Sequence, residues 1–304
     1  MDLKTAKQIF MQSREAEGVT IATYKAYNIT MRQFLLYLYD KDIYSIDQLD
    51  APCIREFLIS VKARGVRNIS VHKDFRVIRT FCLFLFQNDY VDSNPMANVK
   101  APKVEKRIIR TFTAQEIKKL LSAFDTNDYF GMRNYCMMSL LFSTGIRKAE
   151  LCNIRLDDIN VTTELIRIRG KGQKERFVPI GRTMKRTLKA YLVLRDEFVK
   201  RNKRDSMYLY VSAHEDNLTV NGVGGIFYKL KKALKIPGER INCHTWRHTF
   251  AKNYLLNGGD IFSLQKILGH AELESTKIYL NLNTEEMKQQ HAKYNPLDNS
   301  DWLL

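Results

Sequence analysis

Apolar side chains recur at intervals of three and four residues along three stretches of the first hundred residues. The three runs are Tyr24, Tyr27, Met31, Phe34 and Leu38; Ile54, Phe57, Leu58 and Val61; and Val71, Phe75, Ile78, Cys82 and Leu85. This spacing is that of one face of an amphipathic helix, and Ser70 is the expected N-cap of the third run. The aromatic residues are expected in the core, because large apolar side chains are mostly buried. The pattern predicts a small helical domain over residues 1–99.

A basic segment without helical periodicity follows, over residues 100–112. Pro95 and Pro102 prevent one helix from running through this region, because proline lacks an N–H and restricts the residue before it. The cations of the segment are Lys100, Lys103, Lys106, Arg107 and Arg110. Two interpretations stay open: a solvated connection between domains, or a strap along the phosphate backbone of a nucleic acid.

The residues from 113 to 304 predict a second domain, mostly helical with a small antiparallel sheet. Thr113 and Glu116 form a capping-box pattern at its first helix. Residues 165–169 and 177–180 flank a glycine-rich turn, which predicts a hairpin, and residues 207–211 are a candidate third strand. The expected helices cover residues 183–203, 222–235, 245–256, 261–268, 272–281 and 284–293. The predicted fold class is therefore mainly α with a small antiparallel β-sheet.

The charge of the chain indicates a class of partner. The net charge is +16, and residues 1–100 hold 14 Lys and Arg against 11 Asp and Glu, so most of the excess lies in the second domain. Such a balance favours a polyanionic partner, most often a nucleic acid, although simple solubility or an anionic membrane would also account for it. With 45% hydrophobic and 27% charged residues, the chain is expected to be globular.

Targeting and redox features predict a cytoplasmic protein. No apolar run reaches the roughly 18 residues of a membrane span, and the N-terminus lacks the apolar core of a signal peptide. The five cysteines form no CxxC pair, and most lie among apolar neighbours. This is typical of reduced cysteines in a protein core.

Several short segments carry residue types suited to chemistry on a phosphodiester. Arg147 and Arg247 could clamp its non-bridging oxygens, because the planar guanidinium donates two hydrogen bonds and stays charged. Tyr279 offers a hydroxyl nucleophile with a pKa of about 10, and a cationic site would favour its phenolate. Lys171, on the hairpin turn, is a candidate general acid for the departing oxygen.

Each of these residues has a simpler alternative when it is taken alone. Glu150 follows Arg147 by three residues and is expected to pair with it, as on any solvated helix. A turn such as that around Lys171 is common in hairpins. His244 and His248 lie four apart on a predicted helix, a spacing that can hold zinc, but no glutamate stands between them as in the metalloprotease motif.

Taken together, the segments resemble the tyrosine recombinase family, which includes the phage integrases, and their layout is similar to the Xer type. The resemblance covers nearly the whole chain. The family's arginine followed by a glutamate falls on Arg147 and Glu150, and its His-x-x-Arg-His box begins at His244. Trp246 is a departure, where many relatives have leucine. The catalytic residues that the resemblance implies are Arg147, Lys171, His244, Arg247, His270 and Tyr279.

The resemblance implies a helical, SAM-like core-binding domain over residues 1–99, a linker over 100–112, and an α+β catalytic domain over 113–304. It implies a site-specific recombinase that cleaves and rejoins DNA through a 3′-phosphotyrosyl intermediate, without cofactor or metal. His244 and His270 would bind the phosphate or shuttle the tyrosine proton. The implied task is resolution of chromosome or plasmid dimers, or integration and excision of a mobile element, in the bacterial cytoplasm and next to the nucleoid when DNA is bound.

The expected partners are a double-stranded recombination site and three further copies of the chain, arranged as a dimer per site. A second recombinase or an accessory protein is a further candidate. The C-terminal helix is expected to dock onto a neighbouring protomer; the alternative is a helix folded back on its own domain. Phosphate contacts are expected from Lys25, Arg32, Arg67, Lys73, Arg76, Arg79, Lys103, Lys106, Arg107, Lys174 and Arg176.

Two other classes compete with this interpretation. A DNA-binding regulator would have no use for a nucleophile, an acid and two phosphate-binding arginines in one domain. A type IB topoisomerase or a hairpin telomere resolvase uses related chemistry. The length of 304 residues and the segment that follows Tyr279 favour the recombinase.

Overall fold

The computed structural model describes residues 1–104, 110–170, 174–234, 241–270, 272–280 and 284–294. The chain divides into two compact units, Met1–Ile108 and Ile109–Leu304. Among the residues with predicted functions, Lys106, Arg107 and Lys171 lie outside the described residues. Within the described part, no helix is both long enough and apolar enough to cross a membrane.

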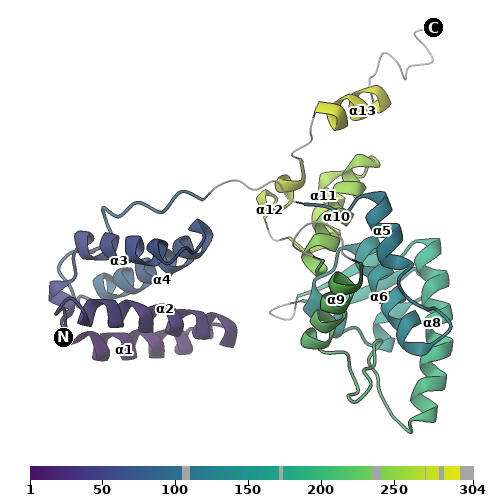
Figure 1. Ribbon diagram of the computed structural model, residues 1–304, viewed down its shortest axis with the longest axis horizontal. Coiled ribbons are helices and arrows are strands. Elements are labelled where there is room, and N and C mark those ends of the chain that lie inside the picture. Colours follow the sequence, from purple (N-terminus) through teal and green to yellow (C-terminus); the bar gives the residue numbers. More distant parts are fainter. Residues whose placement is uncertain (105–109, 171–173, 235–240, 271, 281–283, 295–304) are drawn as a thin grey trace. The chain divides into compact units, whose positions relative to one another are not determined.

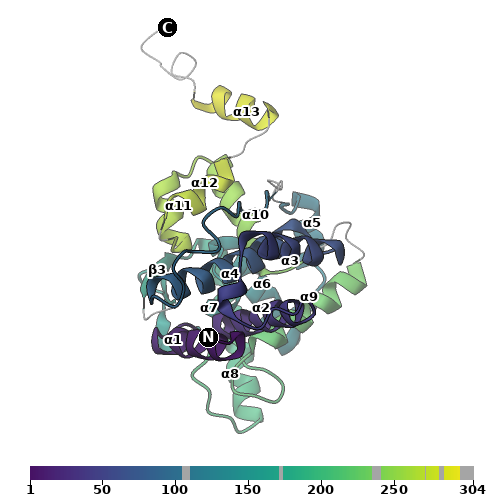
Figure 2. The same cartoon turned by 90° about the vertical axis from the view of Figure 1, so that its left-hand side faces the viewer.

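The first unit, as far as the structure describes it, is a cluster of the α-helices α1 to α4 (Figures 1 and 2). They are α1 (Leu3–Ala16), α2 (Ile21–Tyr39), α3 (Ala51–Ala63) and α4 (Asn68–Gln87), with the short 3-10 helix η1 (Ile46–Gln48) between α2 and α3. Asp2, Thr20 and Asp50 cap α1, α2 and α3, each accepting a backbone N–H from the first turn.

The three apolar runs of the sequence form a large part of the hydrophobic core of this unit. All five residues of the third run are buried on α4, and Met31, Phe34 and Leu38 are buried on α2. Phe10 of α1, a helix absent from the sequence prediction, packs edge-on against Phe81 with ring centroids 5.3 Å apart. The predicted cap at Ser70 is wrong: α4 begins at Asn68, so Ser70 lies inside its first turn.

The second unit is built around α6 (Tyr129–Thr144), which packs against α8 (Arg182–Arg201) and α10 (Cys243–Leu256). The remaining helices are α5 (Ala114–Leu121), α7 (Lys148–Cys152), α9 (Val220–Leu234), α11 (Ile261–Leu268), α12 (Glu274–Lys277) and α13 (Thr284–Tyr294), with the 3-10 turns η2 (Leu156–Asp158) and η4 (Ile278–Leu280). The capping box at Thr113 and Glu116 is present at α5. Trp246 is fully buried, edge-on to Phe112 and Phe142.

The second unit also holds a three-stranded antiparallel sheet in the order β1–β2–β3. Its strands are β1 (Ile159–Asn160), β2 (Leu165–Arg169) and β3 (Glu175–Pro179). The predicted hairpin is β2–β3, in which Leu165 pairs with Pro179 and Arg169 with Glu175. The mainly helical fold with a small antiparallel sheet is thereby confirmed.

The prediction of a strand over residues 207–211 is wrong. Leu209, Tyr210 and Val211 are buried and Met207 is 47% exposed, and the segment forms only an isolated bridge between Tyr208 and Arg155. Side chains satisfy its carbonyl groups in place of a neighbouring strand: Arg195 donates to Tyr208 and Leu209, and Arg133 donates to Val211. Because these backbone groups already have partners, no ladder is needed to bury them. The third strand of the sheet is β1 instead.

Candidate active site

Arg247 lies at the centre of the site, on the first turns of α10, and is only 4% exposed. Its guanidinium donates to the carbonyl oxygens of Gly145 (2.8 Å) and Leu268 (2.9 Å). These carbonyls stand at the C-terminal ends of α6 and α11, where backbone acceptors lack partners within the helix and carry partial negative charge. Two helix ends therefore hold one buried cation. Burial, followed by the charge of Arg147, lowers the pKa of Arg247 to about 10, which leaves it protonated at neutral pH.

Two glycines in the left-handed conformation make this arrangement possible. Gly145 (φ 61°) ends α6 and Gly269 (φ 65°) ends α11, a conformation that glycine adopts without the clash of a Cβ atom. A Cβ atom at Gly145 would lie 2.5 Å from Phe250 and 2.8 Å from Leu268. At Gly269 it would lie 3.0 Å from Arg176. Both positions therefore favour glycine for its conformation, and Gly145 also requires it for space.

Arg147 is held by a carboxylate. Its side chain is 44% exposed, and it donates to Glu150 at 2.9 Å and to the carbonyl of Gly269 at 3.4 Å. Glu150 also accepts the backbone N–H of Arg147 at 2.8 Å, so the expected pair is present and includes the N-terminal cap of α7. This leaves much of the guanidinium facing solvent, where a phosphate could reach it.

Glu150 also forms an ion pair with a second arginine, Arg176 of β3. The two side chains form a bidentate pair with contacts of 2.9 and 2.8 Å, and Arg176 donates its third nitrogen to the carbonyl of Ile267 at 2.8 Å. Burial alone would raise the pKa of Glu150, but the hydrogen bonds from Arg176 and Arg147 outweigh it and lower the pKa to about 2. Arg176 thus joins the hairpin, α7 and the end of α11. The sequence prediction gave it a phosphate contact; the structure instead places its guanidinium on protein acceptors.

Tyr279, the predicted nucleophile, is 6% exposed and packs among Phe250, Leu264 and Leu268. Its hydroxyl lies 3.0 Å from Nδ1 of His248. The pKa of the phenol is raised, because burial outweighs the charge of Arg247, a hydrogen bond with Arg247 and the charge of Arg147. The two arginines favour the phenolate, as the sequence predicted, but burial is the larger effect and the net pKa is raised.

His270 hydrogen-bonds with Arg247 and with Thr276. Its Nε2 lies 2.7 Å from a guanidinium nitrogen of Arg247, and its Nδ1 lies 2.8 Å from the hydroxyl of Thr276. A guanidinium can only donate, so Nε2 is the acceptor and the ring proton is on Nδ1. Burial and then the charge of Arg247 lower the pKa of His270 to about 4, in agreement with this neutral form.

His244 is exposed on the first turn of α10. Its pKa is lowered by partial burial and by the charges of Arg247, Lys148 and Arg147, which places it within the electrostatic reach of both arginines. No group of three or more His, Cys, Asp or Glu side chains that could hold a metal occurs among the described residues. The arrangement around His244 is thus a group of cations and imidazoles, suited to an anion.

A cleft of about 730 Å³ reaches Arg147 and His270, whereas Arg247 and Tyr279 are not among the described residues that line it. Arg147, Arg176 and His270 line one part of it, and Gly170 and Lys174 line another. The N–H of Gly170 donates to the carbonyl of Lys174 at 2.7 Å, so the two residues that flank the turn of Lys171 are close together at the cleft. Lys171 itself lies outside the described residues.

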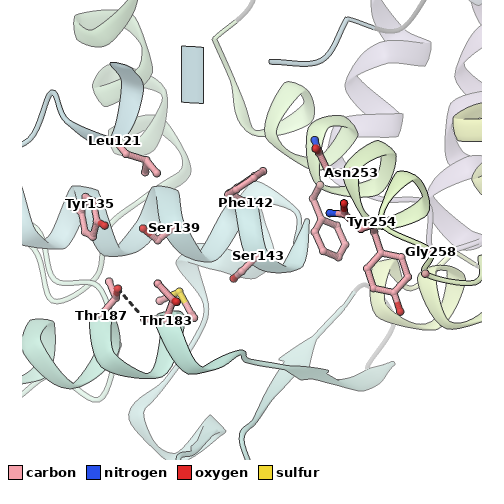
Figure 3. Close-up of a pocket in the computed structure, with 14 residues that line it drawn as sticks. Leu121, Tyr135, Ser139, Phe142, Ser143, Thr183, Thr187, Asn253, Tyr254 and Gly258 are labelled. Atoms are coloured by element: carbon pink, nitrogen blue, oxygen red, sulfur yellow. Dashed lines mark hydrogen bonds between the residues drawn. The ribbon is translucent and has the colours of Figure 1, made fainter. Parts of the chain in front are cut away.

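A second cavity, of about 630 Å³, lies between α5, α6, α8 and α10. Figure 3 shows Tyr135 and Phe142 of α6 on one side, with Asn253 and Tyr254 of α10 at the end nearer Gly258. Among its described lining residues there is no Lys, Arg, His, Asp or Glu. It shares Phe250 with the cluster that buries Tyr279, but its lining offers little for phosphate chemistry, so the candidate site is the cleft.

The predicted phosphate-contacting residues are mostly on the surface. Those in the described part of the chain, other than Arg176, are exposed: Lys25, Arg32, Arg67, Lys73, Arg76, Arg79, Lys103 and Lys174. Lys25 and Arg32 are seven residues apart on α2, and Lys73, Arg76 and Arg79 recur every three residues on α4. The hydroxyl of Thr30 donates to Asp74 at 2.7 Å, which ties these two helices together and so brings the two basic rows onto one small unit.

Sequence reasoning missed two contributors to the site, Arg176 as a partner of Glu150 and His248 as a partner of Tyr279. The signal for Arg176 was its place near the predicted hairpin turn, beside residues already assigned to the site. His248 was part of the recognised His-x-x-Arg-His box but received no role.

Comparison with known proteins agrees with this site. Residues 110–286 match the phage integrase family, and residues 3–101 match the phage integrase SAM-like domain. Tyrosine recombinase XerD of Halalkalibacterium halodurans is 30% identical over 292 residues, which are 95% of this chain and 97% of that protein.

Two solved structures extend the comparison to the fold. The crystal structure of XerA recombinase is 27% identical with a TM-score of 0.53, over 97% of this chain and 99% of that one. The Tn1549 transposon integrase in complex with transposon right end DNA has a TM-score of 0.75 at 18% identity, over 97% of this chain and all of that one (100%). At that identity the likeness concerns the fold alone.

The chain belongs to the phage integrase family. Its similarity to the Xer recombinases over almost the whole length confirms the prediction of a tyrosine site-specific recombinase with a helical N-terminal domain and an integrase catalytic domain.

Proposed function

We propose that Tyr279 is the nucleophile of this recombinase and that Arg147, Lys171, His244, Arg247 and His270 complete its active site. The observation that carries the proposal is the position of the Tyr279 hydroxyl, which lies 3.0 Å from Nδ1 of His248, the neighbour of Arg247 on α10, and within the electrostatic reach of Arg247. A tyrosine held beside a buried cation and a cleft lined by Arg147 and His270 is suited to attack on an anion.

In the proposed reaction, the Tyr279 oxygen attacks the scissile phosphorus while the bond from phosphorus to the 5′-oxygen breaks. The enzyme then holds the 3′-phosphate through a phosphotyrosyl bond, and the 5′-oxygen receives a proton from Lys171. Arg147 and Arg247 neutralise the charge that grows on the non-bridging oxygens, which is the largest contribution to many such reactions. Religation is the same reaction reversed, and the ester bond conserves the energy of the cut strand.

Replacement of Tyr279 by Phe tests the nucleophile. The variant should bind a recombination site as well as the wild type, because it loses only the attacking oxygen. On a nicked duplex that traps the cut state, wild-type enzyme should form a covalent protein–DNA band that Tyr279→Phe does not form. A covalent band of equal yield in the variant would assign the nucleophile to another residue.

The role of Lys171 is tested with an altered leaving group. Lys171→Ala should slow cleavage by about 10²–10⁴-fold, the usual loss of a general acid. A substrate with sulfur in place of the bridging 5′-oxygen needs no proton to depart, so it should restore the rate of the variant. If sulfur restores nothing, the acid is another group.

The proposed partner is a double-stranded recombination site, bound through the basic rows on α2 and α4 together with Lys103, Lys106, Arg107 and Lys174. Such contacts position a protein on DNA without reading its sequence. The proposed task is dimer resolution or integration and excision of a mobile element; the cytoplasmic location predicted from the sequence stays a prediction.

The proposed assembly is a tetramer, two protomers on each site, linked through α13. In the structure α13 contacts its own chain: Gln290 donates to the carbonyl of Leu256 at 2.6 Å, and Glu286 pairs with Lys252 at 2.6 Å. This is the arrangement of the folded-back alternative. Met287 on the same helix is nevertheless 53% exposed, and an exposed apolar side chain there gives a second protomer something to bury.

Truncation after Asn283 separates the two arrangements. Exchange between protomers predicts normal binding to a half-site, weakened cooperative filling of the second half-site, and poor recombination. Cooperative occupancy and recombination that survive the truncation would contradict the exchange.

A further inference from the structure

The imidazole in contact with the oxygen of Tyr279 is that of His248. This residue follows Arg247 on α10 and is half-buried, and its Nδ1 lies 3.0 Å from the Tyr279 hydroxyl, with the two rings tilted by 53° at 5.5 Å. The proposed reaction leaves one proton without a destination, because the phenol must lose its hydrogen as the bond to phosphorus forms. We infer that His248 is the general base that accepts this proton.

His270, one of the two histidines to which the sequence assigned this shuttle, is engaged elsewhere. Its Nε2 accepts from Arg247 and its Nδ1 donates to Thr276, so both ring nitrogens are in use. Its ring is nearly parallel to that of Tyr279, at 6.4 Å between centroids, which is a packing contact. His270 thus orients Arg247, and the nitrogen in contact with the phenol belongs to His248.

The protonation states set the direction of the hydrogen bond. Burial, then the charges of His244 and Arg247, lower the pKa of His248 to about 4, so the imidazole is neutral at neutral pH. Burial raises the pKa of Tyr279, so the phenol keeps its hydrogen. A neutral phenol beside a neutral imidazole nitrogen donates to it, which assigns the ring proton of His248 to Nε2. This is the ground-state geometry that a general base needs.

The arrival of DNA would strengthen this base. The cationic neighbours that lower the proton affinity of His248 are those proposed to bind the phosphate, and an added negative charge opposes their effect. During attack the proton passes from the Tyr279 oxygen to Nδ1 as the oxygen–phosphorus bond forms. During religation the imidazolium returns it to the tyrosine as the leaving group. No oxidant or further reactant is needed.

This inference rests on Tyr279 as the nucleophile. Two substitutions of His248 distinguish a general base from a residue that only positions the phenol. In His248→Asn the side-chain oxygen can accept the phenol hydrogen bond but cannot hold a proton at neutral pH, and His248→Ala offers neither. The rate of covalent adduct formation on a nicked duplex should fall by about 10²–10⁴-fold in both, with the dissociation constant for that duplex unchanged. Recovery of the rate in His248→Asn would make His248 a positioning residue and overturn the inference.

Fluorinated tyrosines at position 279 supply the second readout. Their phenols ionise at progressively lower pH, so they depend progressively less on a base. In His248→Ala the rate should rise as the phenol becomes more acidic, whereas in the wild type it should rise little or fall with the weaker nucleophile. The same dependence in both proteins, or a His248→Ala variant that cleaves as fast as the wild type or faster, would overturn the inference.

The controls keep this failure distinct from failure of the proposed nucleophile. His214→Ala, at an exposed histidine outside the cleft, should leave the rate unchanged. Tyr279→Phe in the same assay reports on the nucleophile alone: if it still forms the adduct, the proposed function fails, whatever the His248 variants do.

Discussion

Arg147 and Arg247 are held in the same site by partners of different kinds. Arg247 is buried against backbone carbonyls at the ends of α6 and α11. Arg147 is 44% exposed, and its shorter hydrogen bond is with one carboxylate, Glu150, which Arg176 holds in turn; its contact with the carbonyl of Gly269 is longer, at 3.4 Å. The position of Arg247 is therefore a property of the fold, whereas that of Arg147 is a property of a few side chains. The first should be sensitive to backbone changes and the second to charge and acid.

The largest effect is expected at Glu150. Glu150→Gln keeps the shape of the side chain but leaves two arginines facing a neutral, buried amide. Breaking a buried ion pair in this way typically costs about 3–5 kcal/mol, and denaturant unfolding should show a loss of that order together with slower cleavage. Glu175→Gln is the control, because its contact with Arg169 is long and exposed and should change stability by about 1 kcal/mol or less. Equal losses in the two variants would contradict the assignment.

A substitution that changes the backbone at Gly145 should displace Arg247. Gly145→Val places a branched side chain at positive φ, where a Cβ atom meets Phe250, so the carbonyl that holds Arg247 must move. Cleavage should fall by about 10²–10³-fold, the loss expected when one donor to the transition state is misplaced. Gly225→Ala on α9, where nothing lies within 4 Å of the added Cβ, should cleave normally. Cleavage by Gly145→Val at the control rate would show that Arg247 does not depend on this carbonyl.

Lowering the pH should weaken the ion pair that holds Arg147, because it protonates Glu150, and should leave the hydrogen bonds from Arg247 to backbone carbonyls in place. The pKa of Glu150 is lowered from 4.5 to about 2 in the folded protein, so its contribution to stability is complete above pH 4.5 and is lost as the pH falls towards 2. By linkage this contribution is about 3 kcal/mol. Unfolding measured between pH 5 and pH 3 should show a smaller loss of stability in Glu150→Gln than in the wild type. Parallel curves for the two proteins would contradict the prediction.

The smallest effect distinguishes a positioning arginine from a phosphate contact. Arg176→Lys keeps the charge but loses the two-pronged contact with Glu150, so cleavage at saturating DNA should fall by about tenfold, or 1.4 kcal/mol, with little change in the salt dependence of binding. Lys174→Ala should do the opposite, reducing the salt slope by about one with little effect on cleavage. Arg176→Gln removes the charge as well, so a salt slope reduced by about one in that variant would restore the phosphate contact first predicted for Arg176.

The parts of the fold that follow from local pattern could be predicted from the sequence. The run from Val71 to Leu85 is buried on α4, and Thr113 caps α5 as its pattern indicated. In each case the signal lies within a few turns of one helix. The segment 207–211 shows the limit: its pattern predicted a strand, but side chains of Arg195 and Arg133 bind carbonyls that a strand would have used.

The site could be predicted only as a set of residue types. The bond between Arg176 and Glu150 joins residues 26 positions apart, and that between His248 and Tyr279 joins residues 31 positions apart. Neither contact could be predicted from helix or strand periodicity, because each depends on the tertiary packing of the hairpin and α11 against α7 and α10. For the same reason the net effect of burial on the Tyr279 hydroxyl could not be read from the neighbouring arginines.

Because Arg247 is bound to the last carbonyl of α11, the stability of this helix end determines how many enzyme molecules are active at a given time. α11 has only eight residues, and helix ends are the parts of a fold that open most readily. Each time the final turn at Leu268 opens, Arg247 and Arg176 lose an acceptor together, although the core of the unit is intact. The fraction of molecules able to cut DNA is then set by the local opening free energy of one helical turn. Hydrogen exchange at the amide of Gly269 measures that quantity directly.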